Sequence, residues 1–426
     1  MKVLMFGWEF PPHISGGLGT ACYGLVKGME HHKQDLIFVV PKLWGDEDPL
    51  AEFVNASEIE IDYRERRFRD IWKSLTYLEV SSFLVPYLSP EEYHNHTERL
   101  LKDQDELESG VLANKFNFSG KYGKDLILEV SRYALVAAQI AKDKKFDLIH
   151  AHDWLSFPAG IAAKKISGKP MIAHVHATEF DRSGQTVNQR VYDIEKAGME
   201  AADKVIAVSQ LTKNTIVTKY GIPEDKVTVV HNAVLDASII KSNVVKQVPE
   251  KIVTFLGRIT FQKGPEYFVE AAAKVIEKDE NVRFVMAGSG DLLNRMIQRV
   301  AELRIGTKFH FTGFLKGDDV DKMFALSDVY VMPSVSEPFG ISPLEAVRHG
   351  TPVIISKQSG VAEVLQNAVK VDFWDIDAMA DAIFALLHYN GISKMFQEMG
   401  REELKKLKWE HVAEKVIGIY KQTVNQ

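Results

Sequence analysis

The sequence alternates short apolar runs with longer amphipathic segments, and it does so in two separate series. The apolar runs of the first series are residues 3–6, 36–40, 147–151, 171–175, 204–208 and 227–230. Those of the second series are residues 252–256, 283–287, 308–312, 329–332 and 353–356. Buried parallel strands are continuous apolar runs joined by crossover helices. The chain is therefore predicted to be an α/β protein with two Rossmann-like, doubly wound parallel sheets.

The domain organisation follows from where this alternation stops. Residues 232–250 are polar and aperiodic, which is typical of a linker. We expect an N-terminal Rossmann-like domain over residues 1–240, with an insertion at about 41–124, and a C-terminal Rossmann-like domain over residues 251–404. Ligands of such sheets bind outside the carboxyl ends of the strands. Two sheets facing each other therefore predict a cleft lined by the loops that follow the strands.

Composition excludes several classes of protein. The chain has 426 residues with a formal net charge of −6, which argues against a dedicated nucleic-acid binder. Its single cysteine, Cys22, excludes an intrachain disulfide and a four-thiolate zinc site. The N-terminus does not read as a signal peptide, and no apolar run reaches the roughly 18 residues of a membrane span. We expect a cytoplasmic protein without an integral membrane segment.

A glycine-rich loop follows the first apolar run. It comprises Ser15, Gly16, Gly17, Leu18 and Gly19, and a helical segment begins directly after it. Glycines let the backbone approach a ligand closely, and a helix N-terminus presents N–H groups that suit phosphate. A plain tight turn is the alternative.

Two cations follow the first strand of the second series. Arg258 comes directly after this strand, and Lys263 lies five residues further on, just before a helix that starts at Pro265. Arginine can grip a phosphate through two parallel hydrogen bonds, and lysine acts as a point charge. The pair predicts an anion site, although two solvated loop cations are the alternative.

A pair of carboxylates follows a later strand of the same series. Seven residues separate Glu337 from Glu345, with Phe339, Gly340 and Ile341 between them. The backbone N–H groups of Gly340 and Ile341 could face a phosphate, and Glu345 could accept the two hydroxyls of a ribose. Acidic residues also favour the first turn of a helix for structural reasons, which is the alternative.

Histidines end two neighbouring strands of the first series. His150 and His152 precede Asp153, and His174 and His176 end the next strand. We expect each strand to send one histidine to each face, with His152 and His176 reaching the cleft. Hydrogen-bonded core residues are the expectation for the other two. No two candidate ligands have the compact spacing of a zinc motif, so no metal is expected.

Together these motifs resemble the retaining nucleotide-sugar glycosyltransferases of the GT-B fold, group 1, in the part of the family that contains glycogen and starch synthases. The resemblance covers roughly residues 3–24, 147–232 and 251–365. It rests on the Gly-Gly-Leu loop, the His-Asp-Trp strand end, Gly-Arg…Lys-Gly and the Glu-x7-Glu motif, in the family's order. It implies a nucleoside diphosphate-sugar as substrate and no cofactor.

The resemblance also implies roles for residues on the donor side. Arg258 and Lys263 would neutralise the donor diphosphate. Gly16 and Gly17 would donate backbone N–H groups to it from the other domain, and Glu345 would hold the ribose.

On the sugar side, the resemblance places Glu337, with Phe339–Ile341, under the transferred sugar. His176 would hydrogen-bond a sugar hydroxyl, and His152 with Asp153 would line the sugar and acceptor side. A last helix within residues 405–426 would cross back onto the N-terminal domain.

The sequence departs from the family at one position. Bacterial glycogen synthases carry Lys-x-Gly-Gly-Leu, and here Ile14 stands in place of the lysine. The first hypothesis is a metal-independent enzyme that moves a hexose, expected to be glucose from ADP-glucose or UDP-glucose, to an α-glucan. The second is a glucosyl- or mannosyltransferase acting on a small sugar, a sugar phosphate or a surface polysaccharide. The third is a non-catalytic protein that binds glucan or nucleotide-sugar.

Overall fold

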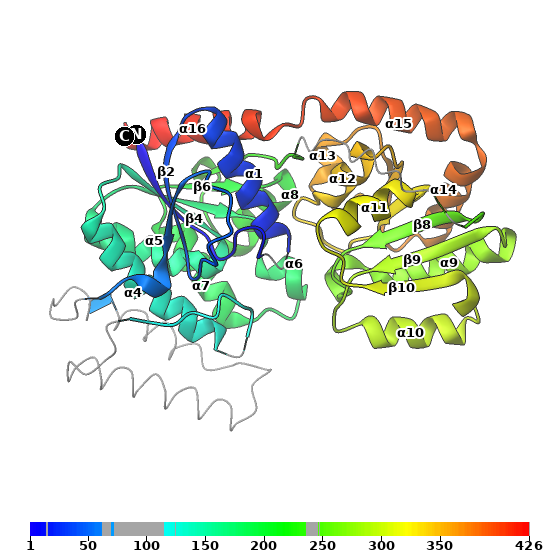
Figure 1. Ribbon diagram of the computed structural model, residues 1–426, viewed down its shortest axis with the longest axis horizontal. Helices are drawn as coiled ribbons and strands as arrows, with labels where there is room; N and C mark the ends of the chain where they lie inside the picture. The colour runs from blue at the N-terminus through cyan, green and yellow to red at the C-terminus, as the bar shows by residue number, and fades with distance from the viewer. Residues whose placement is uncertain are drawn as a thin grey trace, which may run out of the picture.

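The computed structural model of the protein describes residues 1–13, 16–61, 70–71, 115–123, 125–235, 246 and 248–425. Within them the chain forms two parallel β-sheets, of seven and six strands. Figure 1 shows the two sheets in separate lobes that lie side by side, each covered by helices. The predicted fold class, with two Rossmann-like doubly wound domains, is confirmed.

The N-terminal sheet has the strand order β3-β2-β1-β4-β5-β6-β7, and every neighbouring pair is parallel. Its strands are β1 (Lys2–Phe6), β2 (Asp35–Val40), β3 (Glu52–Asn55), β4 (Leu148–His152), β5 (Met171–Val175), β6 (Lys204–Ala207) and β7 (Val227–Val229). Strand order reverses between β1 and β4, and ligands of doubly wound sheets bind at such a switch point.

The helices of this domain connect the strands in the right order for parallel pairing. They are α1 (Gly17–His31), α4 (Leu126–Asp143), α5 (Asp153–Ser167), α6 (Glu179–Ser183), α7 (Gln189–Ala201) and α8 (Gln210–Tyr220). Strand β3 lies inside the segment 41–124 that was predicted to be an insertion, and it pairs with β2. The predicted start of the insertion at about residue 41 is therefore too early. Residues 62–69 and 72–114 of that segment lie outside the described residues.

The C-terminal sheet has the order β10-β9-β8-β11-β12-β13. Its strands are β8 (Lys251–Leu256), β9 (Val282–Ala287), β10 (Phe309–Gly313), β11 (Val329–Met332), β12 (Val353–Ser356) and β13 (Val369–Val371). Its helices are α9 (Pro265–Lys278), α10 (Leu293–Glu302), α11 (Asp318–Leu326), α12 (Ser342–Arg348), α13 (Val361–Val364), α14 (Ile376–His388) and α15 (Asn390–Leu404). Here the order reverses between β8 and β11, which are the strands that precede the two predicted donor motifs.

The last helix, α16 (Trp409–Val424), returns to the N-terminal domain and packs along α1. Figure 1 shows both chain ends at this domain. The close approach of α16 to α1 depends on two glycines of α1. A Cβ built at Gly24 would lie 2.1 Å from the Trp409 ring, and one at Gly28 would lie 2.3 Å from the Trp409 backbone oxygen. Only residues without a Cβ allow this contact.

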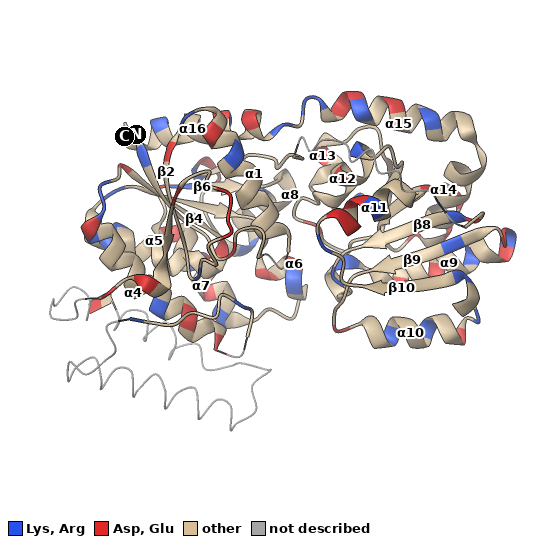
Figure 2. Ribbon diagram, in the orientation of Figure 1, with Lys and Arg blue, Asp and Glu red and all other residues tan. Residues whose placement is uncertain are grey.

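Charged residues of both signs are mixed along the outer helices, including α15 and α16 (Figure 2). Several form pairs between exposed groups, such as Lys405 with Glu402 and Lys274 with Asp377. Pairs of this kind contribute little to stability, because water screens them. The apolar residues that follow the strand pattern are buried instead, and they form the cores of the two domains.

Candidate active site

Lys263 and Glu337, which are predicted to be catalytic with Arg258 and His176, are brought together by two loops of the C-terminal domain. Lys263 ends a short 3₁₀ turn, η3 (Phe261–Lys263), after β8, and Glu337 lies between β11 and α12. The Nζ of Lys263 lies 2.5 Å from Oε2 of Glu337, and the Ser334 hydroxyl donates to the same oxygen at 3.1 Å. The Glu337 side chain is 8% exposed. A buried carboxylate thus has both a cation and a hydroxyl as partners.

Glycine is required where these two loops meet. Gly264 follows Lys263 with φ of +63°, and a Cβ there would lie 2.1 Å from the Pro333 backbone oxygen. Gly340 has φ of +97°, and a Cβ there would lie 3.1 Å from Cγ of Glu337. L side chains rarely adopt such φ values. The Lys-Gly and Phe-Gly pairs of the sequence are therefore what allow Lys263 and Glu337 to meet.

Arg258 lies on the same loop as Lys263 but is exposed to solvent. Its Nη2 donates to Oε1 of the buried Gln262 at 3.2 Å. This single hydrogen bond holds the guanidinium beside η3 and leaves the rest of its donors for a ligand. Arg258 lies after β8, at the strand-order reversal, and its role in an anion site stays a prediction.

The segment from Phe339 to Glu345 forms the end of the loop and the start of α12. Phe339 is buried, and its carbonyl accepts the Val361 N–H at 2.7 Å. Ile341 packs against core residues of both domains. Glu345 lies one turn into α12 and is half-buried. Burial raises the pKa of Glu345, and Arg348 opposes this effect.

Gly16 and Gly17 stand at the N-terminus of α1, as predicted. Gly16 is the N-cap residue and has extended backbone, with φ of −172°. A Cβ built at either glycine would meet nothing within 4 Å. The protein itself therefore leaves open space at this helix start. The neighbouring residues Ile14 and Ser15 lie outside the described residues.

The four histidines occupy one face of the N-terminal sheet, so the expected split between two faces is wrong. Rings of His150 and His152 have centroids 4.2 Å apart, and those of His174 and His176 are 4.3 Å apart. The physical reason is that residues two apart in a strand point to the same side. His150 and His174 are buried core residues, as expected. Nδ1 of His150 and the hydroxyl of Tyr420 form a hydrogen bond of 2.5 Å.

His152, Asp153 and His176 form one connected group. Nδ1 of His152 lies 2.9 Å from Nε2 of His176. The Asp153 carboxylate accepts the backbone N–H of His176 at 2.6 Å. Burial lowers the pKa of His176 to about 3, so its ring is neutral at ordinary pH. Burial also raises the pKa of Asp153 to about 6, against the opposing effects of Arg182 and two backbone N–H groups.

Asp153 has a strained backbone, with φ of +58°. Non-glycine residues in this conformation cost about 1–3 kcal/mol and cluster at functional sites. Here the turn lets α5 begin directly after β4 and aims the carboxylate at the end of β5. The strain therefore serves to fix the position of His176.

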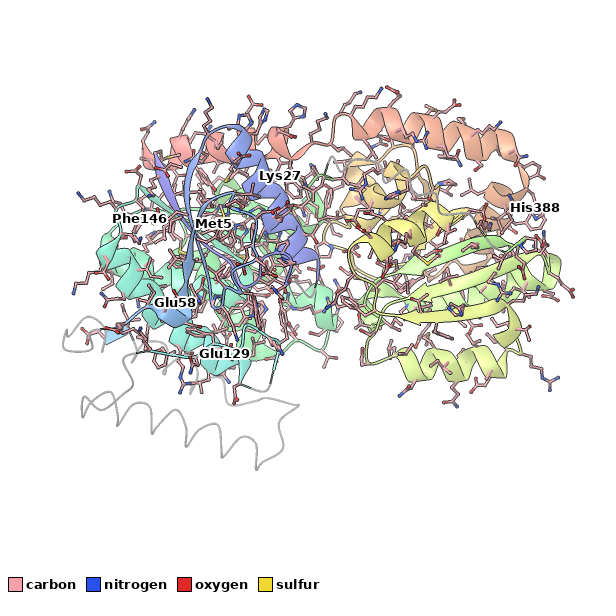
Figure 3. All side chains as sticks on the ribbon, in the orientation of Figure 1. Met5, Lys27, Glu58, Glu129, Phe146 and His388 are labelled. Atoms are coloured by element: carbon pink, nitrogen blue, oxygen red, sulfur yellow. The ribbon has the colours of Figure 1, made fainter. Side chains whose placement is uncertain are left out.

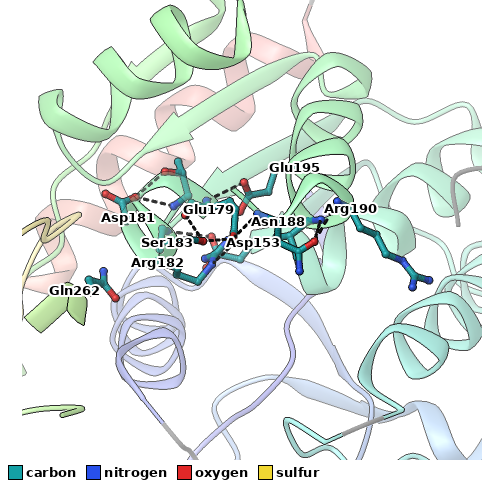
Figure 4. Close-up of polar contacts among 12 residues, drawn as sticks. Asp153, Glu179, Asp181, Arg182, Ser183, Asn188, Arg190, Glu195 and Gln262 are labelled. Atoms are coloured by element: carbon teal, nitrogen blue, oxygen red, sulfur yellow. Dashed lines mark hydrogen bonds and ion pairs between the residues drawn. The ribbon is translucent and has the colours of Figure 1, made fainter. Parts of the chain in front are cut away.

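Sequence reasoning missed a buried ion network behind this group (Figure 4). Arg182 on α6 pairs with Glu179 at 3.2 Å and also with Glu195 of α7. The Tyr220 hydroxyl donates to Glu195 as well. Burial raises the pKa of Glu195 to about 7, while Arg182 and Tyr220 oppose this effect. The only signal in the sequence was a group of charges within short helical segments, which is more typical of a solvated surface.

The strand-end loops of the two domains meet at the same place. The hydroxyl of Ser336, one residue before Glu337, donates to Oδ1 of Asp181 at 2.6 Å. Helix α6, which holds Asp181, also contacts η3. We call this meeting of the loops after β5, β8 and β11 the interdomain junction. It brings the Lys263–Glu337 pair and the His176 loop to one region.

Comparison with known proteins identifies the family. The model of the glycosyl transferases group 1 matches residues 236–403, and that of glycosyltransferase family 4 matches residues 106–236. The chain is a group 1 glycosyltransferase with the GT-B fold. The predicted resemblance is thereby confirmed at the level of family and fold.

Relatives of this glycosyltransferase cover nearly its whole length. It is 28% identical to an uncharacterized glycosyltransferase of Methanocaldococcus jannaschii, over 99% of this chain and 98% of the relative. It is 23% identical to a glycogen synthase of Mycobacterium tuberculosis, over 99% and 94%. Among solved structures, the Anabaena protein HepE in complex with UDP and glucose has a TM-score of 0.64 and 16% identity, with 99% of both chains covered. This last likeness shows the fold.

Within the part of the chain that the structure describes, no helix is both long and apolar enough to cross a bilayer.

Proposed function

We propose that this glycosyltransferase moves a hexose, expected to be glucose, from a nucleoside diphosphate-sugar to an α-glucan with retention of anomeric configuration. The observation that carries the proposal is the interdomain junction. On one side it has the Lys263–Glu337 pair at 2.5 Å, and on the other it has His176 held by Asp153 at 2.6 Å. The contact between Ser336 and Asp181 joins the two sides.

The cationic side suits a diphosphate leaving group. Breaking the bond between sugar and phosphate leaves negative charge on the diphosphate, and fixed cations stabilise that charge as it develops. Arg258 and Lys263 follow β8 within seven residues and are held by Gln262 and Glu337, respectively. Arginine would bind the phosphates through paired hydrogen bonds, and lysine would act as a point charge. No metal is needed for this step.

Glu337, on the cationic side, and His176, on the other side, both suit the sugar. The transferred hexose becomes oxocarbenium-like, so a carboxylate nearby stabilises it, and we assign this role to Glu337. His176 is neutral because burial lowers its pKa to about 3, so it would act on a sugar hydroxyl as a hydrogen-bond partner rather than as a cation. Movement of the domains toward each other would exclude water and limit hydrolysis of the donor.

The donor and acceptor are supported by the relatives and by one residue. Similarity to a glycogen synthase supports a glucan acceptor, and similarity to HepE, which was solved with UDP and glucose, supports UDP-glucose as the donor. The second candidate is transfer to a small sugar or sugar phosphate. It is favoured by Ile14, which removes the lysine that glycogen synthases carry beside the Gly-Gly-Leu loop.

The test is nucleoside diphosphate release from ADP-glucose, UDP-glucose and GDP-mannose, with and without glycogen. Glu337→Gln is the blank, because it keeps the side-chain shape and removes the charge. We expect release from a glucose donor that glycogen stimulates and that a chelator does not reduce. Release without a response to glycogen supports the small-acceptor candidate. If no donor exceeds the blank, the proposed transfer activity is refuted.

A further inference from the structure

An exposed aromatic ring lies at the interdomain junction. Phe261 is the first residue of η3, the turn that ends at Lys263, and it is 55% exposed. The other two residues of the turn are engaged. Gln262 is buried and accepts a hydrogen bond from Arg258, and Lys263 pairs with Glu337. A single exposed apolar residue is common on protein surfaces, but this one lies two residues from a predicted catalytic lysine.

The ring of Phe261 borders the N-terminal domain. Gly184 caps the C-terminal end of α6, and a Cβ built on it would lie 3.6 Å from Cε1 of Phe261. Its φ of +61° is one that L side chains rarely adopt, so the N-terminal domain presents bare backbone to the ring. Helix α6 contacts η3, and Figure 4 shows Gln262 of η3 near Asp181 of α6. Phe261 thus reaches the other domain and is still more than half exposed.

An aromatic ring in this position suits a sugar. The face of the ring carries partial negative charge, and the C–H groups on one face of a glucopyranose carry partial positive charge. Both faces are flat and apolar, so stacking removes the two from water together. Ligand sites are lined by such aromatic groups, with a few polar groups that fix the orientation of the ligand. The exposed ring at the junction therefore fits one pyranose unit.

The acceptor fits this ring better than the donor does. Arg258 and Lys263, proposed for the diphosphate, and Glu345, predicted for the ribose, lie in the C-terminal domain. The ring of Phe261 instead borders Gly184, in the domain that carries the predicted acceptor residues. An α-glucan also extends beyond its reacting end, so further sugar units pass the rim of the junction. This choice between the two substrates rests on the proposed function.

We propose that Phe261 is a platform on which one glucose unit of an α-glucan acceptor stacks. The ring contributes to acceptor binding and takes no part in breaking or forming the glycosidic bond. Chains long enough to reach the ring gain this contact, and a small sugar or sugar phosphate does not. The platform therefore favours a glucan over the small acceptors of the second candidate function.

The binding experiment needs no donor. Full-length protein is run on native gels that contain increasing amounts of glycogen, and the retardation gives an apparent Kd. Phe261→Ala should raise this Kd by about fivefold to tenfold, as expected for the loss of one aromatic stacking contact. Phe261→Tyr keeps a ring and should bind like the parent, whereas Phe261→Leu keeps only apolar bulk and should bind like Phe261→Ala. Melting temperatures show whether each variant folds.

Tyr389→Ala is the matched control. Tyr389 has a ring of similar exposure, at 58%, in the same domain. It directly follows His388, which Figure 3 shows at the end of the C-terminal domain that lies away from the N-terminal domain. This control should bind glycogen as the parent does. An unretarded parent, or equal retardation of Phe261→Ala and the parent, would overturn the proposal.

Kinetics separate the acceptor from the donor. In nucleoside diphosphate release from a glucose donor, Phe261→Ala should raise the KM for glycogen more than the KM for the donor. A larger rise in the donor KM would assign the ring to the donor and overturn the proposal. If glycogen binding depends on Phe261 but no donor is turned over, the proposed function fails and the platform stands.

Discussion

At the scale of single residues, the contact between Lys263 and Glu337 is central to the proposed function. In this structure the lysine neutralises the buried carboxylate, with the Ser334 hydroxyl on the same oxygen. In the proposed function a bound diphosphate would share that cation, so the pair would couple the leaving group to the carboxylate that we assign to the sugar. A buried carboxylate is expensive to leave without its partner. The proposal therefore gives the same contact a part in both stability and catalysis.

Lys263→Ala and Arg258→Ala should each lower turnover by on the order of a hundredfold, because each removes a cation that stabilises the developing phosphate charge. The measurement is nucleoside diphosphate release at saturating donor. Lys274→Ala is the control, since Lys274 forms an exposed pair with Asp377 away from the junction. Turnover within a factor of two of the parent would rule out the assigned roles.

The raised pKa of Glu195 predicts that the stability of the protein depends on pH. The pKa of Glu195 is raised by burial from 4.5 to about 7, so the folded protein binds a proton more tightly than the unfolded chain does. Glu195 therefore makes its full contribution to the free energy of unfolding below about pH 4.5, and this contribution is lost as the pH rises through 7. Glu195→Gln removes this loss. The melting temperature of the variant relative to the parent should rise between pH 5 and pH 8.

The control for this experiment is Glu200→Gln on the same helix, where the carboxylate is 59% exposed. Its difference from the parent should be independent of pH over that range. A Glu195→Gln difference that is flat or falls with pH would contradict the assigned burial of the charge.

Much of the site could be predicted residue by residue, because glycines, cations and carboxylates after strands have few structural uses. The positions of Arg258, Lys263 and Glu337 followed from this logic. Arg182 and Glu195 could not be found, because a buried charge and a solvated one look alike in the sequence. The histidine faces were assigned wrongly, although the two-residue spacing alone places each pair on one side.

At the scale of elements, the contact between α1 and α16 ties the end of the chain to its beginning. Gly24 and Gly28 let Trp409 lie against α1, and Tyr420 of α16 reaches His150 in the sheet. Helix α16 therefore contacts the group of four histidines directly. Helix α16 begins directly after Lys408. Lys408 forms a parallel β-bridge with Val234, which lies where the chain leaves the N-terminal domain.

Gly28→Ala should destabilise the protein by about 1–3 kcal/mol, because its Cβ would meet the Trp409 backbone oxygen at 2.3 Å and neither helix backbone yields easily. The free energy of unfolding in urea measures this. Gly418→Ala on α16 is the matched control, since a Cβ there meets nothing within 4 Å and alanine favours the helix. Equal stability of Gly28→Ala and the parent would refute the tight packing.

Most strands were predicted from their apolar runs: β1, β2 and β4 to β12 match the expected runs within one or two residues. The edge strands β3 and β13 were not predicted, because each is only three or four residues long and includes a charged side chain, Glu52 in β3 and Lys370 in β13. Only pairing with the neighbouring strand makes them strands.

At the scale of the whole molecule, Glu363 joins the two domains. From α13 it accepts the backbone N–H groups of Gln210 and Leu211 at the start of α8, at 2.8 and 2.9 Å, and it pairs with His231 at 2.7 Å. Burial raises the pKa of Glu363, but these hydrogen bonds outweigh it and leave the pKa lowered. A carboxylate of one domain thus caps a helix of the other.

Glu363→Gln should lower the free energy of unfolding by about 1–3 kcal/mol at neutral pH, since it removes charge-assisted hydrogen bonds. Because the folded pKa is lowered, this stability is present above the unfolded pKa of 4.5 and is lost as pH falls through the folded value. The difference between variant and parent should therefore shrink in acid. Glu402→Gln, at an exposed pair with Lys405, should have no such effect. A difference that does not depend on pH would contradict the interdomain cap.

The two-domain architecture followed from the sequence because two series of parallel strands require two sheets. The contacts between the sheets did not follow, because Asp181, Ser336 and Glu363 have no periodic or motif signal. Such contacts depend on how two folded surfaces meet, which no local pattern in the chain encodes.

The most direct test of the proposed chemistry is the anomeric configuration of the first-formed product, followed by NMR during turnover of an α-linked nucleoside diphosphate-glucose. We expect the transferred sugar, or the sugar released by slow hydrolysis, to appear first as the α-anomer, and we expect Glu337→Gln to abolish the signal. A β-anomer formed first would contradict retention at the junction. Absence of any cleavage with every donor would contradict the transferase itself.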